Sequence, residues 1–282
     1  MEEEKKHVDP DLLNPHRSDS KPKSDIQNVS YLARMGTKTE VLGRDKELAL
    51  LQETLYKKRM RNLILVGDPG TGKTELVNFL ATKMKKEATF YYWSIGLTEA
   101  GTDLRGSFEK KISNVIAIAQ RRQGLTNKPV ILFIDEIQSI VTAGSLTGKK
   151  SELSMANMLK PFLTDPNICI WGATTKEEFD ESIANDGALM RRMMPIFINE
   201  LDKDVVLQIL DNFADHKVRQ SLLESIYERS SQLKGFHQPD ISIEILDRML
   251  AKQKCWHERP NEQMLNDIIK TIYITKENKE EN

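Results

Sequence analysis

Cysteine is scarce in this 282-residue sequence, which has only Cys169 and Cys255 and no CxxC pair. Two widely separated cysteines do not make a disulfide framework, so we expect reduced thiols. The five histidines do not follow a metal-ligand spacing either, which argues against a zinc site. A chain of this length can bury enough apolar surface to fold without crosslinks or a structural metal.

Long hydrophobic runs and an excess of charge of one sign are also missing. The longest apolar runs, 63–66 and 130–134, are far too short to cross a bilayer, and the first residues, MEEEKKHVDPD, lack the apolar segment of a secretory signal. We therefore expect a cytoplasmic protein with no membrane partner. The 41 Lys and Arg against 42 Asp and Glu give a formal net charge of −1, so overall electrostatics do not support a nucleic-acid partner.

The pattern along the chain divides it into three parts. Residues 1–28 carry many charges, three prolines and few large apolar side chains, which predicts a disordered arm. In residues 29–200, short β-branched and aromatic runs alternate with amphipathic helical patterns, which predicts an α/β domain with a parallel five-stranded sheet flanked by helices. Residues 201–282 hold four helical patterns, near 203–214, 218–230, 241–252 and 260–274, which predict a small all-α domain.

The strands of the sheet are expected at 62–66, 89–94, 130–134, 168–171 and 196–198. Helices are expected between them at 47–56, 75–84, 108–121 and 152–162. The aromatic residues of the second strand, and likewise Trp171 and Trp256, are interpreted as core residues rather than as ligand contacts.

A glycine-rich loop follows the first strand and opens a helix. Gly67–Thr74 reads GDPGTGKT and fits the P-loop pattern GxxxxGK[ST] in its required strand–loop–helix context. Glycines let backbone N–H groups point inward at phosphate oxygens, aided by the positive end of the helix. Lys73 is expected to reach the β- and γ-phosphates of ATP, and Thr74 to bind Mg²⁺. The predicted phosphate-binding residues are Asp68, Pro69, Gly70, Thr71, Gly72, Lys73 and Thr74.

Two carboxylates end the strand at 130–134, at the edge where ligands gather in open α/β sheets. Asp135 suits the Mg²⁺ shell, and Glu136 suits polarising the attacking water. Another strand ends in hydroxyls, and Thr175 could hold the water or the γ-phosphate or could cap the following helix through Glu178; both roles can coexist. Arg191 and Arg192 stand at an element boundary, where paired arginines are commonly a solvated face, but phosphoryl transfer gains from an arginine near the developing charge.

Several strings in this order resemble the AAA+ family, and specifically the first ATPase module of Clp-type (ClpA, ClpB and ClpC) chaperones and unfoldases. They are VLGRDKE at 41–47, AGTDLRGSFE at 100–109, NMLKP at 157–161, GATT at 172–175 and DGALMRR at 186–192. The resemblance covers residues 30–200 closely and 201–275 loosely.

The resemblance implies roles for further residues. It places Val41, Leu42 and Gly43 beside the adenine, makes Thr175 the sensor 1 residue, and makes Arg191 and Arg192 arginine fingers that act on a neighbouring subunit. It also implies that the helical domain is a lid, with Arg259 as a sensor 2 residue, and that the active species is a homo-oligomer, usually a hexameric ring. In the stretch that resembles the pore loop, Leu104 stands where the family has an aromatic residue and Asp103 where it has a basic one.

Three functions fit these observations. The first is a ring ATPase that remodels a protein substrate, and the second is an ATP-controlled switch that docks on a partner protein. The third, a DNA-associated AAA+ regulator, would use the basic clusters at 57–61 and 83–86, which solvated helix faces explain better.

Overall fold

The computed structural model describes residues 32–37, 40–93, 104–139, 159, 162–164 and 168–280. The predicted N-terminal arm, the segment before Leu104 and most of the expected helix at 152–162 lie outside these residues. Within the described part of the chain, none of the helices is long and apolar enough to cross a membrane.

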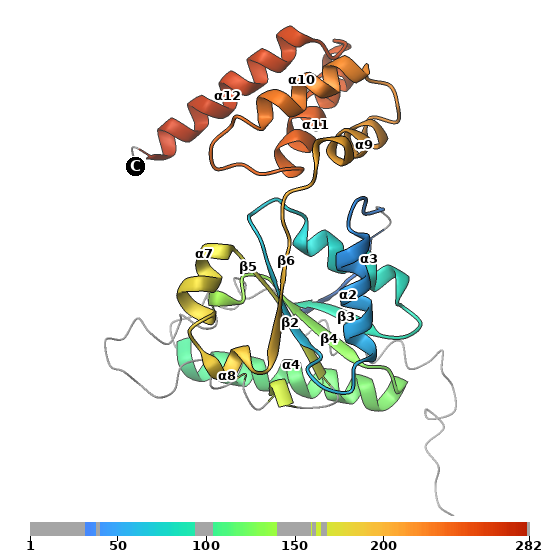
Figure 1. Cartoon of the computed structure of the whole chain (residues 1–282), viewed down its shortest axis with the longest axis vertical. Helices are drawn as coiled ribbons and strands as arrows, with labels where there is room; N and C mark the ends of the chain where they lie inside the picture. The colour runs from blue at the N-terminus through green and yellow to red at the C-terminus, as the bar shows by residue number, and fades with distance from the viewer. Residues whose placement is uncertain are drawn as a thin grey trace, which may run out of the picture.

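A six-stranded sheet with the order β1-β3-β4-β5-β2-β6 forms the centre of the first two hundred residues (Figure 1). Five of its strands are parallel, which confirms the predicted sheet: β2 (Asn62–Val66), β3 (Thr89–Trp93), β4 (Val130–Ile134), β5 (Ile168–Thr174) and β6 (Met193–Phe197). The sequence analysis missed β1 (Leu32–Arg34), which pairs antiparallel with β3 at the edge. It also ended β5 three residues early, because the final Gly-Ala-Thr is not an apolar run.

The strand registers bring like ends together. Thr89 pairs with Val130 and Val130 with Ile168, while Asn62 pairs with Met193. The first residues of the strands therefore lie along one edge of the sheet, which we call the amino edge. The last residues, among them Val66 and its partner Thr174, lie along the opposite edge, which we call the carboxyl edge.

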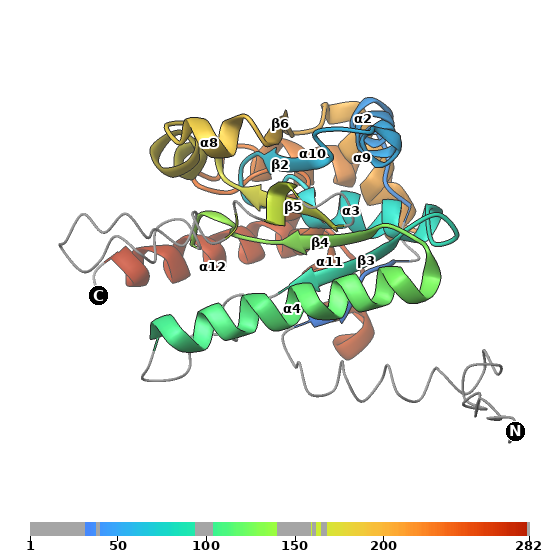
Figure 2. The ribbon, with the colours of Figure 1, turned by 90° about the horizontal axis from the view of Figure 1, so that it is seen from below.

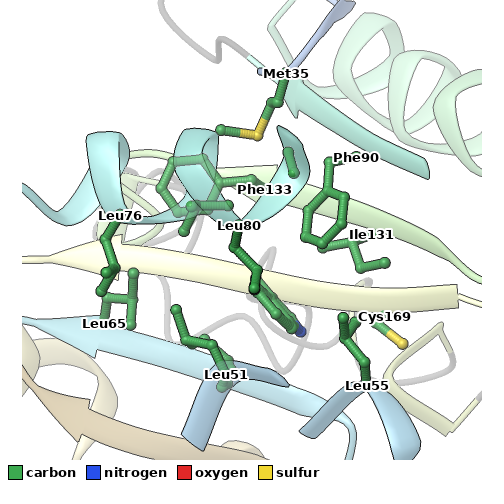
Figure 3. Packing of buried hydrophobic residues seen from close by; sticks show 14 of the residues in the cluster. Met35, Leu51, Leu55, Leu65, Leu76, Leu80, Phe90, Ile131, Phe133 and Cys169 are labelled. Carbon is green, nitrogen blue, oxygen red and sulfur yellow. The ribbon is translucent and has the colours of Figure 1, made fainter. Parts of the chain in front are cut away.

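Helices cover both faces of the sheet, and each face has its own core. On one face, α2 (Asp45–Tyr56) and α3 (Lys73–Lys83) bury Leu51, Leu76 and Leu80 against strand residues such as Phe133, as Figure 3 shows. On the other face, α4 (Leu104–Thr126) buries Val115, Ile116 and Ala119, and Figure 2 shows this long helix running alongside the sheet. β2, β4 and β5 are buried throughout because both of their faces are covered, which explains their continuous apolar sequences.

Four helices follow the sheet and share a third core. They are α9 (Lys203–Phe213), α10 (Gln220–Ser230), α11 (Asp240–Trp256) and α12 (Glu262–Glu280), in agreement with the predicted all-α C-terminal part. Figure 1 shows this helical lid above the carboxyl edge, joined to β6 by one short segment.

The core interpretation of the tryptophans is right for one residue and wrong for the other. Trp171 is completely buried and packs edge-on against Phe90. Trp256, in contrast, is 64% exposed at the C-terminal end of α11. The end of a helix leaves a side chain without a neighbouring turn to cover it, and the apolar residue type alone did not reveal this.

Candidate functional site

The P-loop is held closely between β5, β6 and α3. The backbone N–H of Gly67 donates to the carbonyl of Thr174 at 3.1 Å, and a Cβ at Gly67 would lie 2.2 Å from the carbonyl oxygen of Ile198. Only glycine fits at such a close backbone approach. The loop then turns through the left-handed residues Gly70 (φ +79°) and Gly72 (φ +87°) into the first turn of α3. A helix N-terminus of this kind is suited to bind phosphate.

Lys73 lies inside this loop. Its Nζ donates to the carbonyl oxygens of Gly67 at 2.7 Å and of Asp68 at 2.9 Å. Burial lowers the pKa of the Lys73 ammonium and outweighs the negative charges of Asp135, Asp68 and Glu178, which raise it. The side chain thus lies at the mouth of the loop, where a polyphosphate would be held.

Thr74 and Asp135 form the pair expected of a Mg²⁺ site. The Thr74 hydroxyl donates to Asp135 Oδ2 at 2.8 Å, which joins the start of α3 to the end of β4. A hydroxyl and a carboxylate are hard oxygen ligands, and Mg²⁺ is commonly held by one or two such groups together with substrate phosphates. The two residues therefore fit this ion, although the described residues contain no cluster of three or more metal-binding side chains.

Glu136 is fixed by the turn that ends β4. Its backbone is left-handed (φ +52°), and its carbonyl accepts hydrogen bonds from the N–H and the hydroxyl of Ser139 at 3.0 and 2.7 Å. The next residue, Ile137, donates its N–H to the carbonyl of Ala173 on β5. This unusual backbone leaves the Glu136 carboxylate exposed beside the cavity, where it can contact a water molecule.

Glu178 is the centre of a hydrogen-bond cluster at the end of β5. Its Oε2 accepts from the hydroxyl of Thr175 at 2.7 Å, from the N–H of Thr175 at 3.0 Å and from the hydroxyl of Thr174 at 3.2 Å. Its Oε1 accepts from Gln138 Nε2 at 2.8 Å. The predicted cap is present, because Thr175 and Glu178 form a capping box at the start of α7 (Lys176–Glu178).

These hydrogen bonds also change the pKa of the Glu178 carboxylate. Burial raises the pKa of Glu178, but the hydrogen bonds from Thr175, Thr174 and Gln138 outweigh burial and lower it. The sequence indicated only the capping bond. The bonds from Thr174 and from Gln138, which is 40 residues away, depend on the fold.

Most of the predicted catalytic and phosphate-binding residues line one cavity of about 510 Å³ at the carboxyl edge. The cavity reaches from the P-loop to Asp240 at the start of α11. The predicted residues that line it are Pro69, Gly70, Gly72, Lys73, Thr74, Asp135, Glu136 and Thr175.

A second cavity of about 260 Å³ lies on the other side of the P-loop and has mostly apolar walls. Val41 and Leu42 line it together with lid residues, including Ile209 and Ile243. Its position next to the phosphate site and its apolar character suit a purine base. Gly43 is not in the wall but touches the lid, because a Cβ there would lie 2.6 Å from Cγ1 of Val205.

Arg44 is a buried residue beside the P-loop to which the sequence analysis assigned no role. It is 4% exposed, and its Nη2 donates to the carbonyl oxygens of Thr71 at 2.9 Å and of Asn199 at 2.6 Å. Its Nη1 also pairs with Glu47 at 3.2 Å. One buried guanidinium therefore ties the P-loop to the segment that leads into the lid.

The three predicted arginines lie away from both cavities. Arg191 and Arg192 precede β6 at the amino edge, and Arg192 Nη1 donates to the carbonyl of Ala188 at 2.9 Å in α8 (Gly187–Met190). Since Met193 pairs with Asn62, the five residues of β2, about 3.3 Å each, separate these arginines from the P-loop of their own chain. Arg259 is exposed just before α12, so its role stays a prediction.

The stretch 100–109, which resembles the pore loop, is described only in part. Its residues before Leu104 lie outside the described part of the chain, and Leu104 itself begins α4. The stretch 157–161 is described only at Leu159, which is buried in the core on the α4 side of the sheet.

A P-loop at the carboxyl edge of a parallel sheet, with a Thr–Asp pair and a neighbouring glutamate, defines the nucleoside triphosphatase class of P-loop proteins. Residues 63–199 match the model of the ATPase family associated with various cellular activities (AAA), and this part of the chain belongs to that family.

The comparisons with known proteins place the chain beside Clp proteins. It is 33% identical over 243 residues to the chaperone protein ClpB of Aquifex aeolicus (strain VF5), which is 80% of this chain and 23% of that protein. It is 31% identical over 266 residues to ClpE of Bacillus subtilis (strain 168), an ATP-binding subunit of an ATP-dependent Clp protease, covering 89% of this chain and 37% of that one. The chain thus carries a Clp-type AAA module and spans only about a quarter to a third of these relatives.

Solved structures agree on the fold. A closed-state reconstruction of Hsp104 with ATPγS and FITC casein has a TM-score of 0.66 at 21% identity, covering 89% of this chain and 44% of that chain. The S. cerevisiae Hsp104–ADP complex has a TM-score of 0.63 at 22% identity, covering 79% of this chain and 33% of that one.

Proposed function

We propose that this chain binds Mg-ATP at the carboxyl edge and hydrolyses its terminal phosphoanhydride bond. The observation that carries this proposal is the convergence of Lys73, the Thr74–Asp135 pair and Glu136 around one cavity. The apolar cavity at Val41 and Leu42 would hold the base, with the P-loop between the two cavities.

Each residue has a distinct task in this reaction. Lys73 and the P-loop N–H groups would hold the phosphates, and Thr74 with Asp135 would hold Mg²⁺, which neutralises developing charge on the phosphate oxygens. Glu136 would orient and polarise the attacking water. Thr175 would position the γ-phosphate or the water through its hydroxyl, which Glu178 holds in the ground state.

The position of Arg191 and Arg192 supports an oligomer with shared sites. They stand at the amino edge, a strand length away from the cavity of their own chain, so a charge-stabilising role requires a neighbouring copy. We propose a homo-oligomeric ring, a hexamer by analogy with the resemblance in the sequence.

The action of such a ring is proposed to be the remodelling of a protein substrate. Two of the similar proteins are named a chaperone and a subunit of a Clp protease, and the Hsp104 reconstruction contains casein, a protein. The second candidate is an ATP-controlled switch that docks on a partner protein; Leu104, in place of the aromatic residue of the pore-loop stretch, favours it. A cytoplasmic location belongs to both proposals.

Light scattering on the Glu136→Gln variant, with and without saturating Mg-ATP, tests the proposal. This variant should retain nucleotide and lose hydrolysis, and its mass should rise to about six subunits when Mg-ATP is added. Lys73→Ala is the matched control, because it should block both binding and assembly. A Glu136→Gln protein that binds ATP but stays monomeric would contradict the shared site and favour the switch.

A second measurement tests whether Arg191 and Arg192 act in hydrolysis rather than in folding or ATP binding. Arg191→Ala with Arg192→Ala should keep ATP binding and lose most of the turnover. Mixing this double variant with Glu136→Gln should restore part of the turnover if the arginines act on the neighbour's site. Full activity of the double variant would remove the arginine-finger assignment.

A further inference from the structure

The amino edge of the sheet carries a concentration of positive charge that the net charge of −1 conceals. The segments 57–61, 83–87 and 121–128 lead into β2, β3 and β4. Together they contain ten lysines and arginines and a single carboxylate, that of Glu87. We call the surface formed by these three segments the basic edge.

The fold places the three segments at the same edge of the sheet, with those before β3 and β4 side by side and β5 between β4 and β2. β4 lies beside β3, and β2 lies two places further along the sheet, so the basic edge spans three strand spacings, or about 14 Å. Two contacts link the segments before β3 and β4: Lys128 Nζ donates to the carbonyl of Lys85 at 3.4 Å, and the N–H of Thr89 to the carbonyl of Pro129 at 3.0 Å. The sequence shows these clusters as separate, and only the strand order joins them.

The cations of the basic edge are accessible. Lys58, Arg59, Lys85 and Lys86 are exposed, and no carboxylate among the described residues forms an ion pair with them. Lys83 lies over the ring of Phe79, 4.5 Å from its centre. The like charges of Lys58, Arg59, Lys85 and Lys86 repel one another, so their arrangement favours an external anion.

Apolar and aromatic side chains accompany the cations. Tyr56 is 65% exposed, Met60 is 47% exposed and Leu125 is 66% exposed, all next to or within the basic segments. An exposed tyrosine ring beside lysines and arginines can stack on a base while the cations hold the backbone.

From these observations we propose that the basic edge binds the phosphate backbone of a nucleic acid, without reading its base sequence. Placed along the axis of a duplex, an edge of about 14 Å spans roughly four phosphates of one strand, at about 3.4 Å of axis per phosphate. An acidic protein would also be attracted, but the exposed aromatic ring and the extended row of cations fit a polynucleotide better. The basic edge lies where β2, β3 and β4 begin, whereas the ATP cavity lies where β2, β4 and β5 end, so the inference goes beyond the proposed hydrolysis and stands independently of it.

Fluorescence anisotropy of the full chain with a fluorescein-labelled 20-nucleotide DNA strand and with its duplex tests this proposal. With about four phosphates neutralised, the association constant between 50 and 200 mM salt should fall roughly 150-fold for the duplex and roughly 50-fold for the single strand. The test variant combines Lys58→Glu, Arg59→Glu and Lys85→Glu, all at exposed positions. Each lost phosphate contact should weaken binding about eightfold at 0.1 M salt, so the loss of three contacts should weaken binding roughly 500-fold.

The matched control reverses Lys252, Lys254 and Lys270 on the lid to glutamate, which changes the net charge by the same amount. The control should bind within about threefold of the unmodified chain, and both variants should show unchanged far-ultraviolet circular dichroism. Equal losses in the two variants, or binding that does not depend on salt, would overturn the proposal. If polyglutamate at equal charge displaces the DNA, the ligand of the basic edge is an acidic protein instead of a nucleic acid. If the chain does not bind DNA but associates with itself in a salt-sensitive way, and the test variant loses this association, the ligand of the basic edge is a second copy of the chain.

Discussion

Replacing Arg44 by methionine should loosen the P-loop and the lid connection together. The substitution keeps an extended side chain but removes the donors to the carbonyls of Thr71 and Asn199. A hydrogen bond from a charged group contributes about 1.5–3 kcal/mol, and a buried group left unpaired costs about 1–3 kcal/mol. Thr71 is buried whereas Asn199 is exposed and can bind water instead, so one carbonyl carries most of the loss. We expect the free energy of unfolding of the sheet domain to fall by roughly 2–4 kcal/mol.

Unfolding in guanidinium chloride, followed by tryptophan fluorescence, measures this loss, because Trp93 and Trp171 are both buried in the sheet domain. The expected decrease corresponds to a midpoint about 0.5–1 M lower, for a typical denaturant dependence of a few kcal/mol per M. Titration with a fluorescent ATP analogue should show at least about tenfold weaker binding, because Arg44 fixes the loop that receives the phosphates. Arg59→Met is the control, since Arg59 is exposed and should change neither quantity. An Arg44→Met protein with an unchanged midpoint and unchanged affinity would refute the role assigned to this guanidinium.

Two further predictions follow from the described environments of a thiol and a carboxylate. Burial raises the pKa of Cys169 to about 11, while Cys255 is exposed, so a thiol reagent at pH 8 should label Cys255 quickly and Cys169 only on unfolding. The Cys255→Ser variant should lack the fast phase of labelling. Fast labelling of both thiols would contradict the burial of Cys169. The pKa of Glu178 is lowered by its hydrogen bonds, so its contribution to stability is present above the unfolded pKa of about 4.3 and is lost as pH falls through the lower folded value. Glu178→Gln should therefore show a smaller loss of thermal stability than the unmodified chain between pH 5 and pH 3, and identical pH dependences would contradict this.

Much of the sheet and of the site followed from local sequence. β2 and β4 have the predicted bounds because a strand covered on both faces needs a continuous apolar run, and such a run is visible without any partner. The P-loop was equally accessible, since its glycines, lysine and threonine are neighbours in the chain. The Thr175–Glu178 capping box was found for the same reason: its two residues are three apart.

Features that join distant segments could not be found in this way. Arg44 and Asn199 are 155 residues apart, and Asn62, which accepts from the N–H of Ile170, is 108 residues from its partner. No local sequence pattern near either residue indicates these contacts. The basic edge is a similar case, because the net charge sums over the whole chain and carries no information about which strands become neighbours.

The lid meets the phosphate loop directly, and this contact has a thermodynamic consequence. A Cβ at Gly70 would lie 2.6 Å from Cβ of Asp240, the first residue of α11, so the loop and the lid helix occupy adjoining space. A ligand of the P-loop that favours one position of the lid binds more tightly when a second molecule holds the lid in that position. This follows because the coupling between two binding sites is reciprocal. A partner protein that grips the helical lid can therefore regulate nucleotide affinity without approaching the cavity.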